Sequence, residues 1–334
     1  MNVAVIGLGL IGGSVLRALA ATGHRVLGYD ADPATRATAR TAAAQAPAAH
    51  RWQVTPTIRD TVARAELVVL AVPLPAVGGV LDQLRDAGYA GLVTDVTSVK
   101  GPVAALVEER LHRQPQRLAG FVGGHPMAGR ETSGFGAADP ALFTGCAWVL
   151  CLEPRGTSLA DWLELAALLT PLGARVVPTT AAEHDRAVAA VSHVPHLLAA
   201  ALVAGVADEP LAGTLAAGSF RDGTRVAATR PDLVAAMCGG NAAAVGAALD
   251  RVLAALHEAR AAVDAGEPIA ALRDWLAPAS AARAAWPYRP GTARELPARI
   301  DDLLELGRAG GWVLAVAPNR RTVTAVRPVR PAPA

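Results

Sequence analysis

The fold is decided near the start of the chain, by residues 2–16, which read NVAVIGLGLIGGSVL. The apolar run at 2–6 has the composition of a buried strand, and the glycines after it have the spacing G-x-G-x-x-G. In this pattern the first glycine permits a tight turn, the second lets the backbone approach a pyrophosphate, and the third lets the next helix pack closely on the strand. The stretch therefore predicts a strand–turn–helix unit that binds a dinucleotide through Gly7, Gly9, Leu10, Ile11 and Gly12.

An acidic residue stands at the end of the second predicted strand, residues 25–29. This residue, Asp30, follows Gly12 by nearly the interval of about 20 residues at which such folds hold a ribose. A carboxylate there accepts hydrogen bonds from ribose hydroxyls and repels a 2′-phosphate, and Asp32 adds a second negative charge. We therefore predict NAD rather than NADP as the cofactor. The alternative is that Asp30 only caps the helix that begins at Pro33.

The residue composition and pattern divide the chain into three parts. Short β-branched runs alternate with helical stretches as far as about residue 178, which predicts a doubly wound α/β sheet. The chain then becomes rich in Ala and Leu and poor in strand formers. We predict a Rossmann-type NAD-binding domain over 1–178, an all-helical substrate and dimerisation domain over 179–286, and a Pro-rich C-terminal extension over 287–334. The extension offers a helix at 298–308 and a hairpin of 312–317 with 322–326.

Composition excludes several classes of protein. The 334 residues include 31 basic and 29 acidic side chains without a basic stripe, which argues against a nucleic-acid partner. The longest apolar run of the second half, 197–207, is shorter than the roughly 20 residues of a membrane span. Residues 3–16 lack the basic start of a signal peptide, so the expected compartment is the cytoplasm. The cysteines, Cys146, Cys151 and Cys238, form no CxxC pair and are expected to be small buried residues.

Polar residues gather in further segments: TDVTSVK at 94–100, GGHPMAGRE at 123–131, EHD at 183–185 and SHVPH at 192–196. The first two follow predicted strands, at the sheet edge where ligands bind. The first, second and fourth of these segments, together with GLGLIGGS at 7–14 and FRDGTR at 220–225, resemble in their order the motifs of the prephenate/arogenate dehydrogenase family of tyrosine biosynthesis. The resemblance covers residues 1 to about 285. It implies oxidative decarboxylation of a 4-hydroxycyclohexadiene, in which hydride leaves C4 for a nicotinamide and CO2 leaves C1, without a metal.

The resemblance also implies roles for individual residues. His125 would be the catalytic histidine that bonds the 4-hydroxyl, and Ser98 would orient it and touch the nicotinamide. Arg225 would bind a substrate carboxylate, and Glu131 would lie near the substrate side chain or the entrance to the site. Structural alternatives stay open, a His-Pro turn for His125 and a helix cap for Ser98.

The histidines of the helical half can be argued from local geometry. If Ser192 caps a helix, Pro195 lies in its first turn and His196 sits near the positive helix end, suited to a substrate carboxylate. His184 and His193 either support the site or pack within a helix. Their spacing is not that of a zinc-binding helix, and no metal is predicted.

The predicted function is NAD-dependent oxidative decarboxylation of prephenate to 4-hydroxyphenylpyruvate. Arogenate and 4-amino-4-deoxyprephenate are rival substrates. A 6-phosphogluconate-type dehydrogenase would need a lysine in the helical half, and none follows Lys100. The alternative from another class is a catalytically idle NAD-binding scaffold.

Oligomeric state and regulation are also open to prediction. Helices that are apolar on more than one face must bury the second face, so a homodimer is expected. Some family members carry a tyrosine-sensing domain of about 70 residues, but only some 45 residues follow Trp286. The extension is therefore expected to be a shortened α-β-β remnant.

Overall fold

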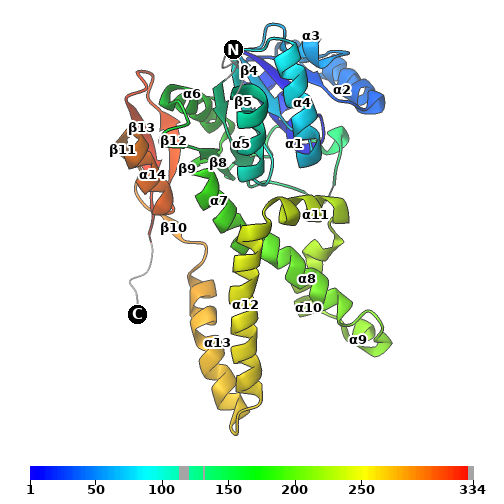
Figure 1. The fold of residues 1–334 in the computed structure, drawn as a ribbon, viewed down its shortest axis with the longest axis vertical. Helices are drawn as coiled ribbons and strands as arrows, with labels where there is room; N and C mark the ends of the chain where they lie inside the picture. Colours follow the sequence, from blue (N-terminus) through cyan, green and yellow to red (C-terminus); the bar gives the residue numbers. More distant parts are fainter. Residues whose placement is uncertain (113–119, 131, 330–334) are drawn as a thin grey trace. The chain divides into compact units, whose positions relative to one another are not determined.

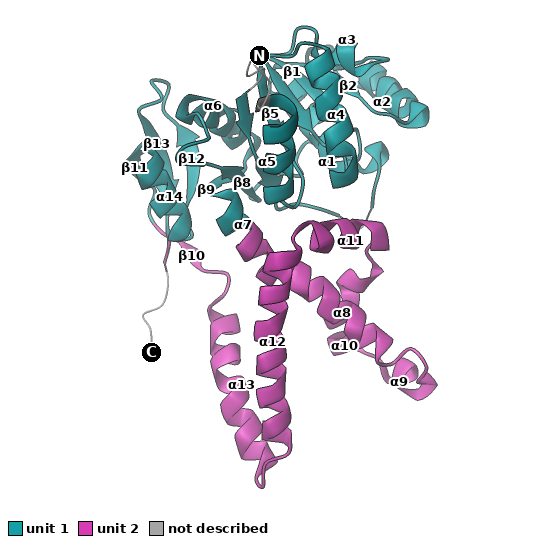
Figure 2. Cartoon of the chain, in the orientation of Figure 1, with its two compact units in different colours: residues 1–184, 292–327 teal, residues 185–291, 328–334 magenta. Residues whose placement is uncertain are grey.

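The computed structural model describes residues 1–112, 120–130 and 132–329, and the chain divides into two compact units (Figures 1 and 2). Unit 1 comprises residues 1–184 and 292–327, and unit 2 comprises residues 185–291 and 328–334. The division falls within helix α7 (Ala181–Val188), shortly after the boundary expected at residue 178.

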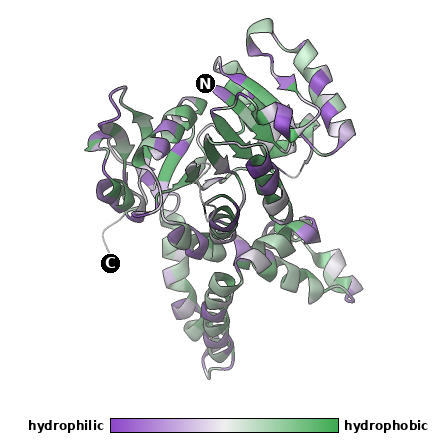
Figure 3. Cartoon of the chain, turned by 45° about the horizontal axis from the view of Figure 1, so that its top comes forward, coloured by the Kyte–Doolittle hydropathy of each residue, from purple (hydrophilic) through white to green (hydrophobic). Residues whose placement is uncertain are grey.

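The first sheet of unit 1 is parallel throughout, with strand order β3-β2-β1-β4-β5-β6. Alternate residues of β1 face opposite cores: Val3 and Val5 pack with residues of α1 and α2, and Ala4 and Ile6 with residues of α3, α4 and α5. Helices thus cover both faces, which confirms the doubly wound fold, and the buried strands are strongly hydrophobic (Figure 3). The elements are β1 (Asn2–Ile6), α1 (Leu10–Ala21), β2 (Arg25–Tyr29), α2 (Pro33–Gln45), β3 (Gln53–Val54), α3 (Ile58–Val62), β4 (Leu67–Leu70), α4 (Leu74–Asp86), β5 (Leu92–Asp95), α5 (Gly101–Val107) and β6 (Gly120–Val122).

A second, mixed sheet completes unit 1, with strand order β11-β13-β12-β9-β8-β7. The sequence predicts one doubly wound sheet as far as about residue 178, which would include the strands at 147–151 and 175–179. They form the second sheet instead, because the short strand β7 turns back and pairs antiparallel with β8. The elements are β7 (Gly124–Pro126), β8 (Ala147–Cys151), α6 (Leu159–Leu169), β9 (Arg175–Thr179), β11 (Arg294–Pro297), α14 (Ile300–Arg308), β12 (Trp312–Val316) and β13 (Thr322–Val326).

The C-terminal extension does not form a separate module after the helical half. The expected helix and hairpin are present as α14 and as the antiparallel pair β12–β13, but they belong to unit 1. Leu303 and Leu306 of α14 and Val313 of β12 are buried in the same core as Val176 of β9. Burial of these side chains explains why the extension packs there.

Unit 2 is almost entirely helical, as the sequence predicts. Its small buried core includes Val194, Val245 and Ala248. Beyond the second half of α7 it contains α8 (Val194–Ala204), α9 (Pro210–Leu215), α10 (Gly218–Thr224), α11 (Pro231–Gly240), α12 (Ala242–Val263), α13 (Pro268–Ala285) and the short pair β10 (Arg289–Pro290) and β14 (Pro328–Val329).

One long helical segment corrects a prediction. Helix α7, a π-helical turn (Ala189–His193) and α8 run without a break from Ala181 to Ala204. Ser192 therefore caps no helix, and His196 does not lie at a free helix N-terminus. Pro195 lacks an N–H, and the π-helical turn just before it accommodates the missing helical hydrogen bond.

Two helical stretches of the described chain could cross a membrane by length and composition alone. One is Ala181–Ala204, of which 28% of the apolar window is buried, and the other is the pair α11–α12, bent by 94°. Apolar helices of soluble proteins pass the same test, so the evidence for a span is weak. The expected absence of a membrane segment stays a prediction.

Candidate active site

The glycine-rich turn is built as its motif requires. Gly7 has φ +96°, in the left-handed region that favours glycine. A Cβ on Gly12 would lie 1.9 Å from the carbonyl oxygen of Gly7, so that position cannot carry a side chain without a shift. A Cβ on Gly9 would meet nothing within 4 Å. Space is therefore open beside the N-terminus of α1, where unpaired N–H groups favour a pyrophosphate.

Two aspartates follow β2, and the structure separates their roles. Asp30 accepts hydrogen bonds from the backbone N–H of Leu8 (2.7 Å) and of Asp32 (2.9 Å), so its carboxylate lies beside the glycine-rich turn. Asp32 caps α2 by accepting from the N–H groups of Ala34 and Thr35. Bonds from the Thr35 hydroxyl and these N–H groups lower the pKa of Asp32. The alternative that Asp30 is only the cap is therefore wrong.

His125 lies in β7 and is paired with a second histidine. Its position in the register is opposite Val149 of β8. Its Nδ1 is 2.9 Å from Nε2 of His184, and the two rings meet edge to face with centroids 5.1 Å apart. His184, in the first turn of α7, is only 3% exposed. One nitrogen of this pair must donate and the other accept, so the contact selects the tautomers of both rings.

A buried ion pair fixes the residue before His125. Lys100 Nζ bonds the carboxylate of Asp95 and the carbonyl oxygen of Gly124, and Asp95 Oδ1 accepts from the Gly124 N–H at 3.1 Å. The side chains of Lys100 and Asp95 are 1% and 0% exposed. Each charge has its partner, which makes their burial tolerable. The sequence prediction gave neither residue a role, although two opposite charges beside an apolar strand were a usable signal.

The remaining predicted residues of the first half are less closely tied to His125. Helix α5 begins at Gly101 with Lys100 at its N-cap, so Ser98 does not cap it. Ser98 is half-buried, and no hydrogen bond joins it to His125 within the part of the chain that the structure describes. Glu131 lies outside the described residues.

Unit 2 brings two other predicted residues together. His196 Nδ1 is 3.1 Å from the carbonyl oxygen of Val226, the residue after Arg225. Arg225 is exposed at the start of a 3-10 turn. His193 is fully buried beside Asn241, which donates to the carbonyl of Asp185. Of the two histidines left open by the sequence, His193 packs among helices and His184 contacts His125.

The structure also bears on two other kinds of site, a metal centre and a reactive cysteine. The described residues contain no group of three or more His, Cys, Asp or Glu side chains arranged to hold a metal ion. Cys146, Cys151 and Cys238 form no disulfide within the described part of the chain. Burial raises the pKa of Cys146 to about 11, so it is a thiol at neutral pH.

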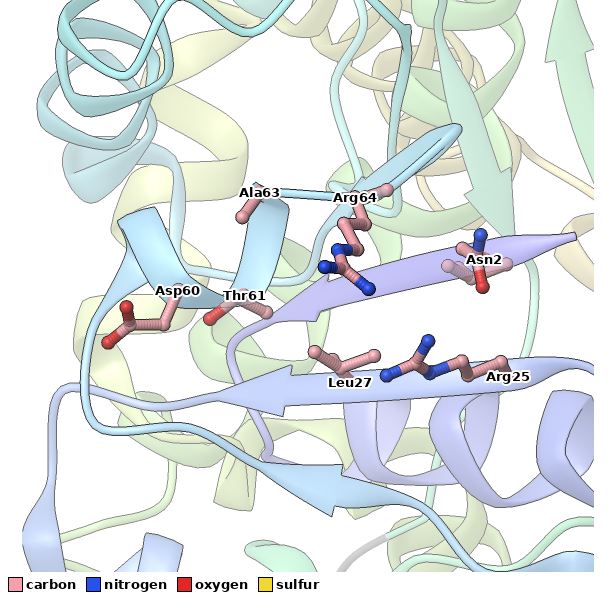
Figure 4. Close-up of a pocket in the computed structure, with 9 residues that line it drawn as sticks. Asn2, Arg25, Leu27, Asp60, Thr61, Ala63 and Arg64 are labelled. Atoms are coloured by element: carbon pink, nitrogen blue, oxygen red, sulfur yellow. The ribbon is translucent and has the colours of Figure 1, made fainter.

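Two cavities of unit 1 lie away from the glycine-rich turn. One, of about 200 Å³, is at the amino ends of β1 and β2, where Arg25 and Arg64 point into the same space (Figure 4). The glycine-rich turn follows the opposite, carboxyl end of β1. The other cavity, of about 190 Å³, lies beside Lys100 and is also lined by Cys151 and Glu153.

The fold and the glycine-rich turn place the chain in the class of oxidoreductases with a Rossmann-type nucleotide-binding domain. The family model described as the nucleotide-binding domain of prephenate dehydrogenase matches residues 15–178, and the model of its dimerization domain matches residues 180–277. The chain belongs to the prephenate/arogenate dehydrogenase family. Residues 278–334 lie beyond both matches.

Named relatives agree with this family. The prephenate dehydrogenase of Bacillus subtilis is 34% identical over 242 residues, 69% of this chain and 61% of that protein. The cyclohexadienyl dehydrogenase of Zymomonas mobilis is 33% identical over 275 residues, 78% of this chain and 88% of that protein. The match thus spans less than two thirds of the length of the Bacillus protein.

Solved structures agree as well. Arogenate dehydrogenase of Synechocystis is 28% identical with a TM-score of 0.72, over 86% of this chain and 100% of that one. Prephenate dehydrogenase of Aquifex aeolicus, in complex with hydroxyphenyl propionate and NAD+, is 25% identical with a TM-score of 0.75, over 85% of this chain and 97% of that one.

Proposed function

We propose that this protein is an NAD-dependent prephenate dehydrogenase of tyrosine biosynthesis, which converts prephenate and NAD+ to 4-hydroxyphenylpyruvate, CO2 and NADH. The observation that carries the proposal is the pairing of His125 with His184, in a member of this family whose glycine-rich turn leaves room for a pyrophosphate. This arrangement offers one imidazole nitrogen to a substrate hydroxyl and uses the other for orientation.

The cofactor fits the residues at the carboxyl end of β1. Gly7, Gly9 and Gly12 would admit the pyrophosphate, with Leu10 and Ile11 in the first turn of α1, and Asp30 would accept from the ribose hydroxyls. The carboxylate of Asp30 would disfavour a 2′-phosphate. When bound, the nicotinamide supplies the acceptor for the hydride that leaves C4 of the ring.

His125 would act on the 4-hydroxyl of the substrate. If Nδ1 of His125 donates to Nε2 of His184, Nε2 of His125 keeps its lone pair and accepts the hydroxyl hydrogen bond. That bond stabilises the positive character that develops at the oxygen as C4 is oxidised. The electrons of the bond to the departing carboxylate then complete the aromatic ring, and the product keeps its hydroxyl proton.

The other residues would hold the substrate in place. Arg225 can make two parallel hydrogen bonds with one carboxylate, and His196 is suited to the second. Because His196 is not at a helix end, its role depends on the hydrogen bond of Nδ1 to Val226, which leaves Nε2 for the substrate. Ser98 would lie near the nicotinamide, and Glu131 near the substrate side chain.

A substrate panel tests the proposal. The full chain is mixed with NAD or NADP and with prephenate, arogenate or 4-amino-4-deoxyprephenate, and absorbance at 340 nm is followed. We expect the highest kcat/KM with NAD and prephenate. A preference for arogenate or the 4-amino diene would change the proposed substrate but not the proposed type of reaction. No reduction with any of the three would favour the idle NAD-binding scaffold.

We further propose that unit 2 forms a homodimer. Many of its large apolar side chains are exposed, among them Leu211, Leu215 and Ile269. An apolar groove of about 310 Å³, lined by Leu256 and Trp275 among others, lies in the same unit. Such surfaces usually mark an interface. Light scattering at several concentrations should give twice the chain mass, and a monomer at all concentrations would contradict the proposal. The cytoplasm remains the expected compartment.

A further inference from the structure

Residues 292–327 pack closely against β9, the strand that leads into α7. Helix α14 packs so closely on β9 that a Cβ on Gly307 would lie 1.8 Å from the carbonyl oxygen of Pro178. Trp312 of β12 lies under the guanidinium of Arg175, with 5.2 Å from Cζ to the ring centroid. Residues 292–327 themselves lie after both family-model matches, the second of which ends at residue 277.

The first turn of α7 is held by a network of side chains. Thr180 and Glu183 form a capping box: the Glu183 N–H donates to Thr180 Oγ1 at 3.3 Å, and the Thr180 N–H donates to Glu183 Oε2 at 3.2 Å. Glu153 accepts from the N–H of Ala181 at 2.7 Å. Burial acts to raise the pKa of Glu183, but hydrogen bonds from Arg308 and Thr180 outweigh it and lower the pKa. Glu183 is therefore ionised at neutral pH.

Arg308, the last residue of α14, reaches this network. Its Nε donates to Glu183 Oε1 at 2.7 Å, so the two oxygens of one carboxylate bond α14 and the capping box respectively. The next residue is His184, whose N–H donates to the carbonyl of Thr180 at 2.9 Å and whose ring contacts His125. Three consecutive contacts thus connect Arg308 with His184, and a fourth connects His184 with His125.

We propose that Arg308 is a positioning residue for the reaction: by holding Glu183 it fixes the first turn of α7 and keeps His184 oriented to accept from Nδ1–H of His125. This inference rests on the proposed function, in which Nε2 of His125 must accept from the substrate hydroxyl. The segment 292–327 then supports the reaction site.

Substitutions at the two ends of the ion pair test the proposal. We expect Arg308→Gln and Glu183→Gln each to lower kcat about fivefold, to leave the KM for NAD unchanged and to shift the pH profile of kcat/KM. Arg308→Lys, which keeps a cation near Glu183, should recover most of kcat. The matched control is Arg327→Gln in the same segment, because Arg327 pairs with Glu305, 3.1 Å away, and not with α7. It should behave as wild type.

Nitrogen-15 shifts of the two histidines provide a readout that needs no turnover. In the wild-type chain we expect the proton of neutral His125 on Nδ1, and in Arg308→Gln a mixture of tautomers. Unchanged shifts and an unchanged pH profile in Arg308→Gln would overturn the positioning role. A wild-type chain that oxidises none of the three dienes would overturn the proposed function instead, and the shifts would still decide the role of Arg308. Should Arg308→Gln fold poorly, Arg308→Lys and Glu183→Gln carry the same comparison.

Discussion

The two sheets of unit 1 are assembled in opposite ways. The first joins neighbouring strands of residues 2–122 in parallel, mostly through helices between them. The second combines three strands from residues 124–179 with three from residues 294–326 and mixes parallel with antiparallel pairs. The first carries the glycine-rich turn and the second carries His125. Nucleotide binding is thus encoded in contiguous sequence, whereas the placement of His125 depends on pairing between distant segments.

His125→Asn should distinguish most clearly between the functions of the two sheets, turnover and NAD binding. Loss of the imidazole should lower kcat about a thousandfold with little change in the affinity for NAD, because the substitution leaves the first sheet intact. Stopped-flow or steady-state assays give kcat, and calorimetry gives the NAD affinity. The partner variant Arg225→Ala should chiefly raise the KM of the substrate. If both variants weakened NAD binding equally, the assignment of NAD binding to the first sheet and of turnover to the second would be contradicted.

Gly307→Ala should damage the second sheet selectively. The new Cβ would collide with the Pro178 carbonyl, so α14 must move, at a cost of about 3 kcal/mol in the free energy of unfolding. Chemical denaturation measures this loss. The matched control is Gly79→Ala in α4, where a Cβ meets nothing within 4 Å and alanine should stabilise the helix by up to about 1 kcal/mol. Equal stability of the two variants would show that the contact with Pro178 is unimportant.

Substitutions of two glycines in the turn should distinguish NAD binding from the stability of the fold in the first sheet. Gly9→Ala adds a methyl group to open space, so we expect an unchanged melting temperature and an affinity for NAD about thirtyfold weaker, or about 2 kcal/mol. Gly12→Ala places its methyl group against Gly7, so both quantities should fall. Calorimetry with NAD and thermal melts without it distinguish the two. An unchanged affinity in Gly9→Ala would place the pyrophosphate elsewhere.

The smallest effect is expected at the cap of α2. Because the native pKa of Asp32 is lowered, the ionised cap stabilises the fold above the ordinary aspartate pKa, and this contribution is lost as the pH falls through the native pKa. The melting temperature of Asp32→Ala should therefore lie below that of wild type at pH 7, and the two should converge below about pH 4. Asp208→Ala, which removes a carboxylate from the turn before α9 but no helix cap, is the control and should leave the melting temperature at pH 7 unchanged. If the melting temperatures of Asp32→Ala and wild type differed by the same amount at every pH, the ionised cap would not be the cause of the difference.

The first sheet could be predicted from sequence because its signals are local. The strands at 2–6 and 25–29 have the expected bounds, and α2 begins at Pro33 as expected. Buried runs, a Pro at the first turn of α2 and a glycine motif each act within a few residues. The second sheet could not be assigned, since β8 and β9 have the same apolar composition as the strands of the first. Strand β7, Gly-His-Pro, has too few residues for any pattern.

The same contrast applies to the candidate site. The positions of the glycines follow from the spacing of one motif, but the contact of His125 with His184 joins residues 59 positions apart. No periodicity encodes such a pair. His196 was assigned to a helix start because Ser192 and Pro195 have the composition of a cap. The π-helical turn that joins α7 to α8 leaves no such sign in the sequence.

The late position of β12 in the chain has a consequence for synthesis on the ribosome. Strand β9 has β8 on one side, but its other partner is Val313 of β12, which is translated only after all of α8 to α13. Until then one edge of β9 carries unpaired N–H and C=O groups, while the first sheet already has all its strands. A nascent chain of this protein is therefore most prone to aggregate through the β9 edge, and chaperones that bind extended apolar segments have their natural target there.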